Sequence, residues 1–228
     1  MDEAKYLEQG KRLYKENRYE EALEYFHKDV VGDESLFWRA MCLWHLDQPA
    51  ESVLYFDKCI DVDPDEALPH YYKSRVLFSD LQSFELAKEC IEQAILRDPD
   101  NPTFINQKGH ILLGLNLYEQ ALEAFNEAIS LSDDFIPSTC EGAIKCLINL
   151  NRIQKAQEYC EIWVENDVDP ELALKYRAQL QTTVGDSAKL VAAFEQIDEE
   201  VAATRVNPLV WFAVGTLFAI AINKFVIN

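Results

Sequence analysis

Residues 118–128 read Tyr-Glu-Gln-Ala-Leu-Glu-Ala-Phe-Asn-Glu-Ala, and degenerate copies of this stretch recur along the chain. In the better copies a small residue is followed four positions later by a bulky one. The small position is held by Ala22, Ser52, Ala87, Ala121, Ala156 and Leu190, at intervals of 30, 35, 34, 35 and 34 residues. The bulky position is held by Phe26, Phe56, Ile91, Phe125, Cys160 and Phe194. A regular period of about 34 residues is typical of a repeat architecture.

A second set of positions lies twelve residues before each small residue. It is held by Gly10, Ala40, Arg75, Gly109, Ile144 and Ala178. This spacing predicts two antiparallel helices in each repeat, with small residues where the helices come closest and the bulky residue filling the gap to the next repeat. One helix pair cannot bury its own apolar face, so the pairs must stack. Arg75 and Ile144 are large for their positions, and we expect them to disturb the local packing.

The turns between repeats carry the tripeptide Asp-Pro-Asp at residues 63–65 and 98–100. Proline cannot continue a helix, and aspartate is a favoured cap for the helix that follows. The acidic residues at these turns are therefore predicted to be helix caps. They lack the glycine and the distal glutamate that a calcium-binding loop of the EF-hand type needs.

These residues resemble the tetratricopeptide repeat (TPR) family, whose pattern spans about 34 residues. The best match is the fourth repeat, with Gly109, Tyr118, Ala121, Phe125 and Ala128 in the family's positions. The resemblance implies an all-α fold, a TPR-type right-handed solenoid of about six helix pairs over residues 1–204. Its units are expected near residues 3–32, 33–66, 68–101, 102–135, 137–170 and 171–204. TPR proteins bind other proteins or peptides, and the resemblance implies this function here.

The formal net charge is −19, and residues 31–204 hold 32 acidic and 13 basic side chains. A field of this sign repels phosphates, so we expect no nucleic acid partner. The same field favours a basic partner, although solubility alone is an alternative explanation of the charge.

The sequence contains no glycine-rich phosphate loop, no nucleophile elbow and no zinc-binding pair of cysteines. We therefore expect no enzymatic activity, no cofactor and no metal site. Six cysteines without a C-x-x-C motif, and a start without the features of a signal peptide, predict a reducing, cytosolic setting.

In TPR proteins the first helix of each pair lines the concave face of the stack. The resemblance places on this face Lys11, Tyr14, Phe37, Trp38, Met41, Trp44, Tyr72, Val76, Asn106, His110 and Leu113. An aromatic groove of this kind binds amphipathic helices or extended peptides, so we expect a protein or peptide partner of basic or amphipathic character. For any single residue the alternative is packing against the neighbouring helix.

One TPR subtype binds the acidic tails of chaperones through a clamp. It has a Lys-x-x-x-Asn pair, an Asn in the next unit and a Lys-x-x-x-Arg pair in the third. The matching positions here hold Leu7 and Lys11, then Trp38, then Pro69 and Lys73. The clamp is absent and an acidic body repels an acidic tail, so we expect no chaperone-tail binding.

Residues 208–222 contain no charged or amide side chain, and apolar residues resume at 225–227 after Asn223 and Lys224. A helix of about 20 residues spans a bilayer core of about 30 Å. Residues 205–228 are therefore predicted to be one C-terminal transmembrane helix, with the Lys224 amine extended to the far interface. The anchor residues are Pro208, Leu209, Val210, Trp211, Phe212, Leu217, Phe218, Ile220 and Ile222. The alternative is a buried helix that caps the last repeat.

Together these features predict a non-catalytic, membrane-anchored adaptor or receptor that faces the cytosol and contacts lipid only through its anchor. The short span suits a thin membrane, and the arrangement is similar to tail-anchored TPR proteins of the mitochondrial outer membrane, with the endoplasmic reticulum as the alternative. Two other functions stay open: a permanent structural subunit of a membrane complex, and a soluble TPR scaffold with a buried C-terminal helix.

Overall fold

The computed structural model describes residues 3–28, 33–166, 168, 170–182 and 196. The chain divides into two compact units, unit 1 (Met1–Pro99) and unit 2 (Asp100–Asn228). Unit 1 contains α1 (Glu3–Lys15), α2 (Tyr19–Lys28), α3 (Asp33–His45), α4 (Pro49–Val62), α5 (Ala67–Ser79) and α6 (Phe84–Arg97). Unit 2 contains α7 (Pro102–Gly114), α8 (Tyr118–Leu131), α9 (Pro137–Asn149), α10 (Ile153–Glu165) and α11 (Pro170–Thr182). The described residues form helices and turns without a strand, which confirms the all-α prediction.

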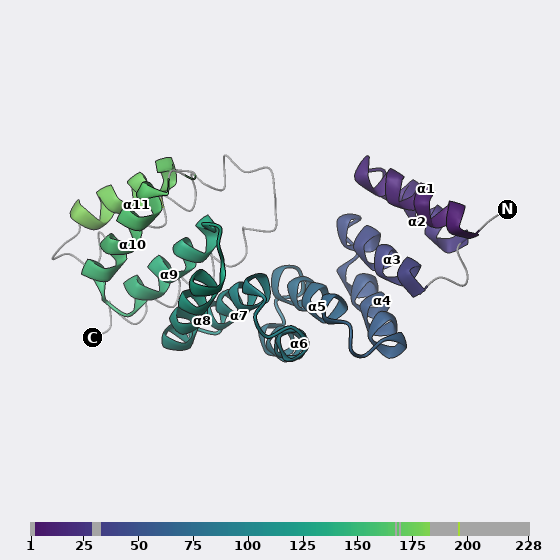
Figure 1. Ribbon diagram of the computed structural model, residues 1–228, viewed down its shortest axis with the longest axis horizontal. Helices are drawn as coiled ribbons and strands as arrows, with labels where there is room; N and C mark the ends of the chain where they lie inside the picture. The colour runs from purple at the N-terminus through teal and green to yellow at the C-terminus, as the bar shows by residue number, and fades with distance from the viewer. Residues whose placement is uncertain (1–2, 29–32, 167, 169, 183–195, 197–228) are drawn as a thin grey trace. The chain divides into compact units, whose positions relative to one another are not determined.

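Within each unit the helices form successive hairpins (Figure 1). In unit 1, α1 packs on α2, α3 on α4 and α5 on α6, and each hairpin also packs on the next through α2 with α3 and α4 with α5. In unit 2, the pairs α7–α8 and α9–α10 follow the same rule, and α11 packs on α10. The second helix predicted for the sixth repeat falls within residues 183–204, of which only residue 196 is described.

The small and bulky repeat positions form the centre of each hairpin. The residues at both positions are completely buried in the five described repeats. The small residues are Ala22, Ser52, Ala87, Ala121 and Ala156, and the bulky residues are Phe26, Phe56, Ile91, Phe125 and Cys160. The Phe125 ring lies between two glycines. A Cβ atom on Gly109 would lie 2.6 Å from its Cε1 atom, and a Cβ atom on Gly142 would lie 2.3 Å from its Cζ atom. The ring therefore occupies the space that any side chain at these glycines would need.

Arg75 and Ile144 do not disrupt the hairpins, which corrects the expectation from their size. Ile144 is completely buried inside α9. The bulky position of its own repeat is held by the small Cys160, and that of the Arg75 repeat by Ile91 instead of phenylalanine. A smaller residue at the bulky position leaves volume for a larger one at the other, so the core stays filled.

The turn inside each hairpin contains one residue with a left-handed backbone. These residues are Asn17 (φ 59°), Asp47 (59°), Gln82 (48°), Asn116 (61°) and Asn151 (56°), each two positions before the second helix of its pair. Asn and Asp tolerate this conformation better than other residues with a side chain, so four of the five turns use a suitable residue. Gln82 is the exception.

The predicted aspartate caps are wrong. The residues at the N-cap positions of α5 and α7 are Glu66 and Asn101, and only the Asn101 side chain accepts a bond from its helix, 3.1 Å from Thr103 N. The Asp63 carboxylate instead accepts from the Asp65 backbone N–H at 3.1 Å. Asp63 thus bonds within the turn between α4 and α5, and Asp63 and Asp98 lie at the C-cap positions of α4 and α6.

All six cysteines are free; five are buried and Cys90 is partly buried. Burial raises the pKa of Cys42, Cys146 and Cys160 to about 12 and that of Cys140 to about 11. These thiols are packing residues of the helix hairpins and are protonated at neutral pH.

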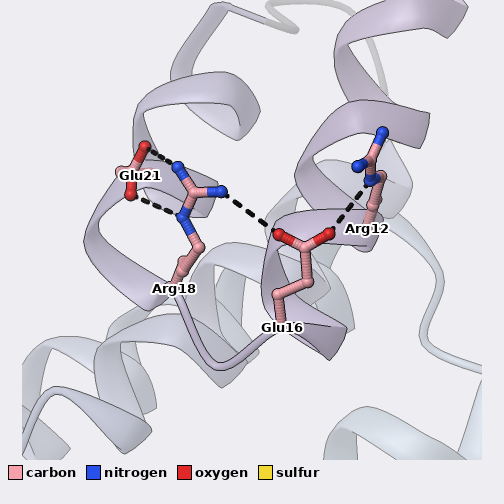
Figure 2. Close-up of polar contacts among 4 residues, drawn as sticks. All are labelled: Arg12, Glu16, Arg18 and Glu21. Carbon is pink, nitrogen blue, oxygen red and sulfur yellow. Dashed lines mark hydrogen bonds and ion pairs between the residues drawn. The ribbon is translucent and has the colours of Figure 1, made fainter.

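Four charged side chains form an exposed network at the turn between α1 and α2 (Figure 2). Arg12 Nε donates to Glu16 Oε1 at 3.0 Å, and Arg18 Nη1 donates to Glu16 Oε2 at 3.2 Å. Arg18 also donates to both oxygens of Glu21, at 2.7 and 2.5 Å. Hydrogen bonds from the arginines lower the pKa of both glutamates.

No helix among the described residues is both long and apolar enough to cross a bilayer. The predicted anchor, residues 205–228, lies outside the part of the chain that the structure describes.

Candidate protein-binding face

Five aromatic residues from the first helices of three hairpins lie together in unit 1. We call this surface the aromatic face; it consists of Tyr14 (α1), Phe37, Trp38 and Trp44 (α3), and Tyr72 (α5). Ring centroids are 5.1 Å apart for Tyr14 and Trp38, 5.8 Å for Phe37 and Trp38, and 5.3 Å for Phe37 and Tyr72. Each ring meets the next edge to face, which is a favourable aromatic geometry, so the five form one continuous surface.

The rings of the aromatic face differ in exposure. Tyr14, Phe37, Trp38 and Tyr72 are partly exposed, whereas Trp44 is 7% exposed and donates from Nε1 to Asp80 Oδ2 at 2.9 Å. Two buried phenylalanines of the second helices support the face from below: Phe26 stacks on Trp38 at 6.2 Å, and Phe56 meets Phe37 at 5.9 Å. The exposed rings are therefore held in place by the core.

Several predicted groove residues lie in the core instead. Val76 is fully buried and Leu113 is 2% exposed, so neither offers a surface to a partner. Met41 is 8% exposed and acts, like Trp44, mainly as a support. In unit 1, α5 packs against both α4 and α6, and Val76 on this helix has no exposed surface. Period and register alone could not separate these residues from their exposed neighbours.

A polar rim borders the aromatic face on the side of α1. Lys11 Nζ lies 2.6 Å from Glu34 Oε1 and 3.7 Å from a Glu8 carboxylate oxygen. Trp38 Nε1 also donates to Glu34, at 3.4 Å. The hydrogen bond from Lys11 lowers the pKa of Glu34, and the bond to Glu34 raises the pKa of Lys11. Lys11, which was predicted as a groove residue, is thus held in an ion pair at the edge.

Tyr14 and His45 connect the first two hairpins. The Tyr14 hydroxyl and His45 Nε2 are 2.8 Å apart, and the His45 ring stacks on Tyr19 at 4.4 Å with an interplanar angle of 5°. Burial raises the pKa of Tyr14, and burial followed by the charge of Arg75 lowers the pKa of His45. At neutral pH this pair is therefore uncharged.

Arg75 lies against the aromatic face. Its guanidinium carbon is 4.9 Å from the ring centroid of Trp44, 5.8 Å from that of Tyr71 and 5.9 Å from that of Tyr72. The side chain is partly buried. A guanidinium over several aromatic rings gains cation–π attraction and loses part of its hydration. The sequence marked this residue only as too large for its repeat position.

The remaining predicted groove residues, Asn106 and His110, belong to unit 2. Asn106 Oδ1 accepts a bond from Thr139 Oγ1 at 3.0 Å, and the His110 ring meets Phe125 at 5.0 Å, edge to face. Both side chains are partly buried. Burial lowers the pKa of His110 to about 4, so the ring is neutral at physiological pH.

An ion pair that sequence reasoning missed lies on α9 of unit 2. Lys145 Nζ is 3.2 Å from Glu141 Oε1, with 14% and 13% of the two side chains exposed, and the Tyr176 hydroxyl donates to the same oxygen at 3.1 Å. Burial raises the pKa of Glu141, but Lys145 and the Tyr176 bond outweigh it and the pKa is lowered. The four-residue spacing of Glu141 and Lys145 was the available signal.

Unit 2 also contains a cavity of about 460 Å³ between α8, α9 and α10. Its lining combines isoleucines, such as Ile129 and Ile162, with the polar turn 132–134. Within the described residues, no group of three or more His, Cys, Asp or Glu side chains could hold a metal ion.

The fold and the aromatic face define a helical-hairpin repeat protein with an exposed aromatic surface. The repeats themselves match a family model: residues 33–66, 73–101 and 103–135 match the tetratricopeptide repeat. These three matched segments, which span α3 to α8, are similar to TPR repeats. The match confirms the resemblance seen in the sequence for the second to fourth repeats.

Several solved structures share the fold. MamA residues 41 to the end from Desulfovibrio magneticus RS-1 superposes with a TM-score of 0.67 at 22% identity, over 73% of this chain and 96% of that chain. PilF from Pseudomonas aeruginosa gives 0.69 at 15% identity, over 89% and 93%. A tetratricopeptide repeat protein from Parabacteroides merdae ATCC 43184 gives 0.71 at 10% identity, over 97% and 91%. No match was found among curated protein sequences. At these identities the structures support the fold alone.

Proposed function

We propose that this chain is a non-catalytic scaffold that binds a protein partner on the aromatic face of unit 1. The observation that carries the proposal is the partial exposure of Tyr14, Phe37, Trp38 and Tyr72 on one continuous surface. Tryptophan and tyrosine are enriched among the residues that contribute most to protein binding.

The arrangement suits binding better than a purely structural role. Trp44 and Met41 are buried, so packing explains them. Trp38 is different, because its ring is supported by Phe26 on one side yet remains partly exposed. A ring held in place before binding loses little conformational entropy when a partner covers it. The rim that Lys11 and Glu34 form supplies the polar border that interfaces have around an apolar centre.

Photocrosslinking tests this function in the full chain. A photoreactive phenylalanine analogue replaces Trp38, and in a matched control it replaces Leu86, which is 53% exposed on α6. We expect a discrete crosslinked protein from position 38 in extracts of the source cells, and its loss when Phe37→Ala is added. Equal products from both positions, or none from position 38, would contradict the proposal.

We further propose that residues 205–228 anchor this scaffold in an organelle membrane, with the repeats in the cytosol. The support is the run of 15 residues without charge at 208–222. The span is short, which favours the mitochondrial outer membrane, with the endoplasmic reticulum as the alternative. Alkaline carbonate extraction of the tagged full chain and of residues 1–204 tests this. We expect the full chain to stay in the membrane fraction and residues 1–204 to be released, and the position of the tag in the cell identifies the organelle. Release of the full chain as well would contradict an anchor.

A further inference from the structure

We infer that the partner segment bound by the aromatic face presents an Asp or Glu side chain, surrounded by apolar residues, to the guanidinium of Arg75. This inference rests on the proposed function and names the chemistry of the partner. It is the opposite of the basic partner that the net charge of −19 predicts.

The first reason is the placement of Arg75. Its guanidinium is partly buried and lies on the rings of Trp44 and Tyr72, two members of the aromatic face. After burial, the charge of Arg75 is the second cause of the lowered pKa of His45. Any segment that covers the aromatic face also covers Arg75 and removes more of its water.

The second reason is that Arg75 forms no ion pair with any residue that the structure describes, whereas two neighbouring lysines do. Lys11 pairs with Glu34 at 2.6 Å, and Lys73 pairs with Asp57 at 2.5 Å. The acids at the face are also committed: Glu34 accepts from Lys11 and Trp38, and Asp80 accepts from Trp44 and Ser79.

A covered guanidinium without an anion beside it is costly, even where it bonds to a neutral hydroxyl such as that of Tyr71, and a carboxylate from the partner removes that cost. The planar guanidinium matches a carboxylate through two parallel hydrogen bonds, and such charge-assisted bonds are among the strongest in proteins. Because the surrounding surface is aromatic, the residues beside that acid should be apolar.

The acidic body of the protein opposes this pairing only weakly. Exposed charges are screened beyond about 8 Å at physiological ionic strength, whereas a partly buried pair is screened much less. The proposed contact also differs from the chaperone-tail clamp. The residues of this chain that match the clamp positions are Leu7, Lys11, Trp38, Pro69 and Lys73, and Arg75 is not among them. The proposed ligand also differs, because a single acid in an apolar segment is not an acidic tail.

Selection from a random peptide library displayed on phage tests the inference with the full chain in detergent. The baits are the wild type, Arg75→Met, Arg75→Lys and Arg12→Met. Arg12→Met is the matched control, because it removes the same charge from the exposed network of Figure 2. We expect the wild type and Arg12→Met to enrich peptides with one Asp or Glu between apolar residues, and Arg75→Met to lose that preference.

Fluorescence anisotropy then compares one selected peptide with its Glu→Gln version. The wild type should bind the acidic version at least about tenfold more tightly, and Arg75→Met should not discriminate. Arg75→Lys should discriminate less than the wild type, because an ammonium cannot form the planar double contact. Raising the NaCl concentration from about 50 to about 300 mM should not lower the affinity for the acidic peptide. Circular dichroism confirms the helical content of each variant, and if Arg75→Met is unfolded, the Arg75→Lys comparison decides.

The outcomes separate the two proposals. If peptides are selected and lost on Trp38→Ala, but are neutral or basic, the proposed function stands and this inference is overturned. The inference also fails if Arg75→Met keeps the acidic preference. If no bait selects a peptide, the aromatic face does not bind linear segments and this inference is overturned, whereas the crosslinking experiment decides the proposed function.

Discussion

Helix α3 in unit 1 and helix α9 in unit 2 are each the first helix of a hairpin, and they carry different kinds of residue at the same repeat positions. Phe37 and Met41 lie 15 and 11 residues before the small residue Ser52, and Glu141 and Lys145 lie at the same offsets before Ala156. In unit 1 the first of these positions contributes to a partly exposed aromatic face. In unit 2 the two positions hold an internal ion pair that is 13–14% exposed. The repeat thus defines where a side chain lies, and the residue type decides whether the position joins an aromatic cluster or an ion pair.

The largest expected effect comes from Phe125→Ala in unit 2. This ring is fully buried between Gly109 and Gly142, whose missing side chains leave nothing else to fill its volume. Removing a buried phenylalanine side chain costs about 3–5 kcal/mol, and this site should lie at the upper end because glycines cannot close the cavity. Hydrogen exchange of α7 to α10 measures the loss in the free energy of unfolding. A loss below about 1 kcal/mol would show that the hairpins collapse around the cavity.

A smaller effect is expected from Lys145→Met, because it leaves the Glu141 carboxylate without its cation. Breaking a fully buried pair costs about 3–5 kcal/mol, and the remaining exposure of this pair reduces our expectation to about 2 kcal/mol. Urea unfolding monitored by circular dichroism measures the change in the free energy of unfolding.

The matched control for this prediction is Lys175→Met. Lys175 also pairs with a glutamate four residues earlier, Glu171, at 3.6 Å, but the two side chains are 40% and 84% exposed. We expect a change within about 0.5 kcal/mol for this pair. Equal losses for the two lysines would mean that the burial of the α9 pair does not distinguish it energetically.

The next effect is acid sensitivity of unit 2 through His110. Its folded pKa, about 4, lies below the ordinary value of 6.5, so between these values the unfolded chain binds more protons and stability falls as pH falls. From pH 7 to pH 5 we expect unit 2 to lose about 1 kcal/mol through this residue, after allowing for its partial exposure. The lowered pKa of Glu141 adds its loss only below 4.5.

Hydrogen exchange of α7 to α10 at several pH values measures this slope. His110→Gln should remove most of it, whereas His27→Gln in unit 1, at an exposed position, should leave it unchanged. A slope that persists in His110→Gln would assign the acid sensitivity to other groups.

The smallest effect is expected in the network of Figure 2. Arg18 bonds to both Glu16 and Glu21, yet all of these side chains are exposed. Surface ion pairs in water contribute little to stability, so Arg18→Met should leave the melting temperature unchanged within error. A clear drop in the melting temperature would show that this turn matters more for unit 1 than its exposure suggests.

The helix hairpins were predictable because they depend on a spacing that is visible in the chain. The positions of Ala121 and Phe125 in the period of about 34 residues indicate the paired helices and their closest approach. The left-handed turn residues were not predicted, although Asn17, Asn116 and Asn151 stand at equal distances before the second helices. They were missed because a single residue in a turn adds nothing to hydrophobic periodicity.

The exposure of the predicted groove residues was predictable only in part. Phe37, Trp38 and Tyr72 are partly exposed, but Val76 and Leu113 share their register and are buried. Whether a residue at these positions is covered depends on the size of its neighbours on other helices, which a single repeat does not show. Arg75 is the clearest case, since its significance appears only with the three rings beside it.

The buried cysteines have a consequence for the chemical reactivity of the protein. Thiolates, and not thiols, react with maleimides and oxidants, and burial holds the pKa of Cys42, Cys140, Cys146 and Cys160 at about 11–12. These side chains should stay silent toward labelling reagents while the hairpins are folded. A cysteine introduced at an exposed site such as Leu86 should therefore react much faster than these four. Their reaction with a maleimide would in turn report the opening of the hairpins that bury them.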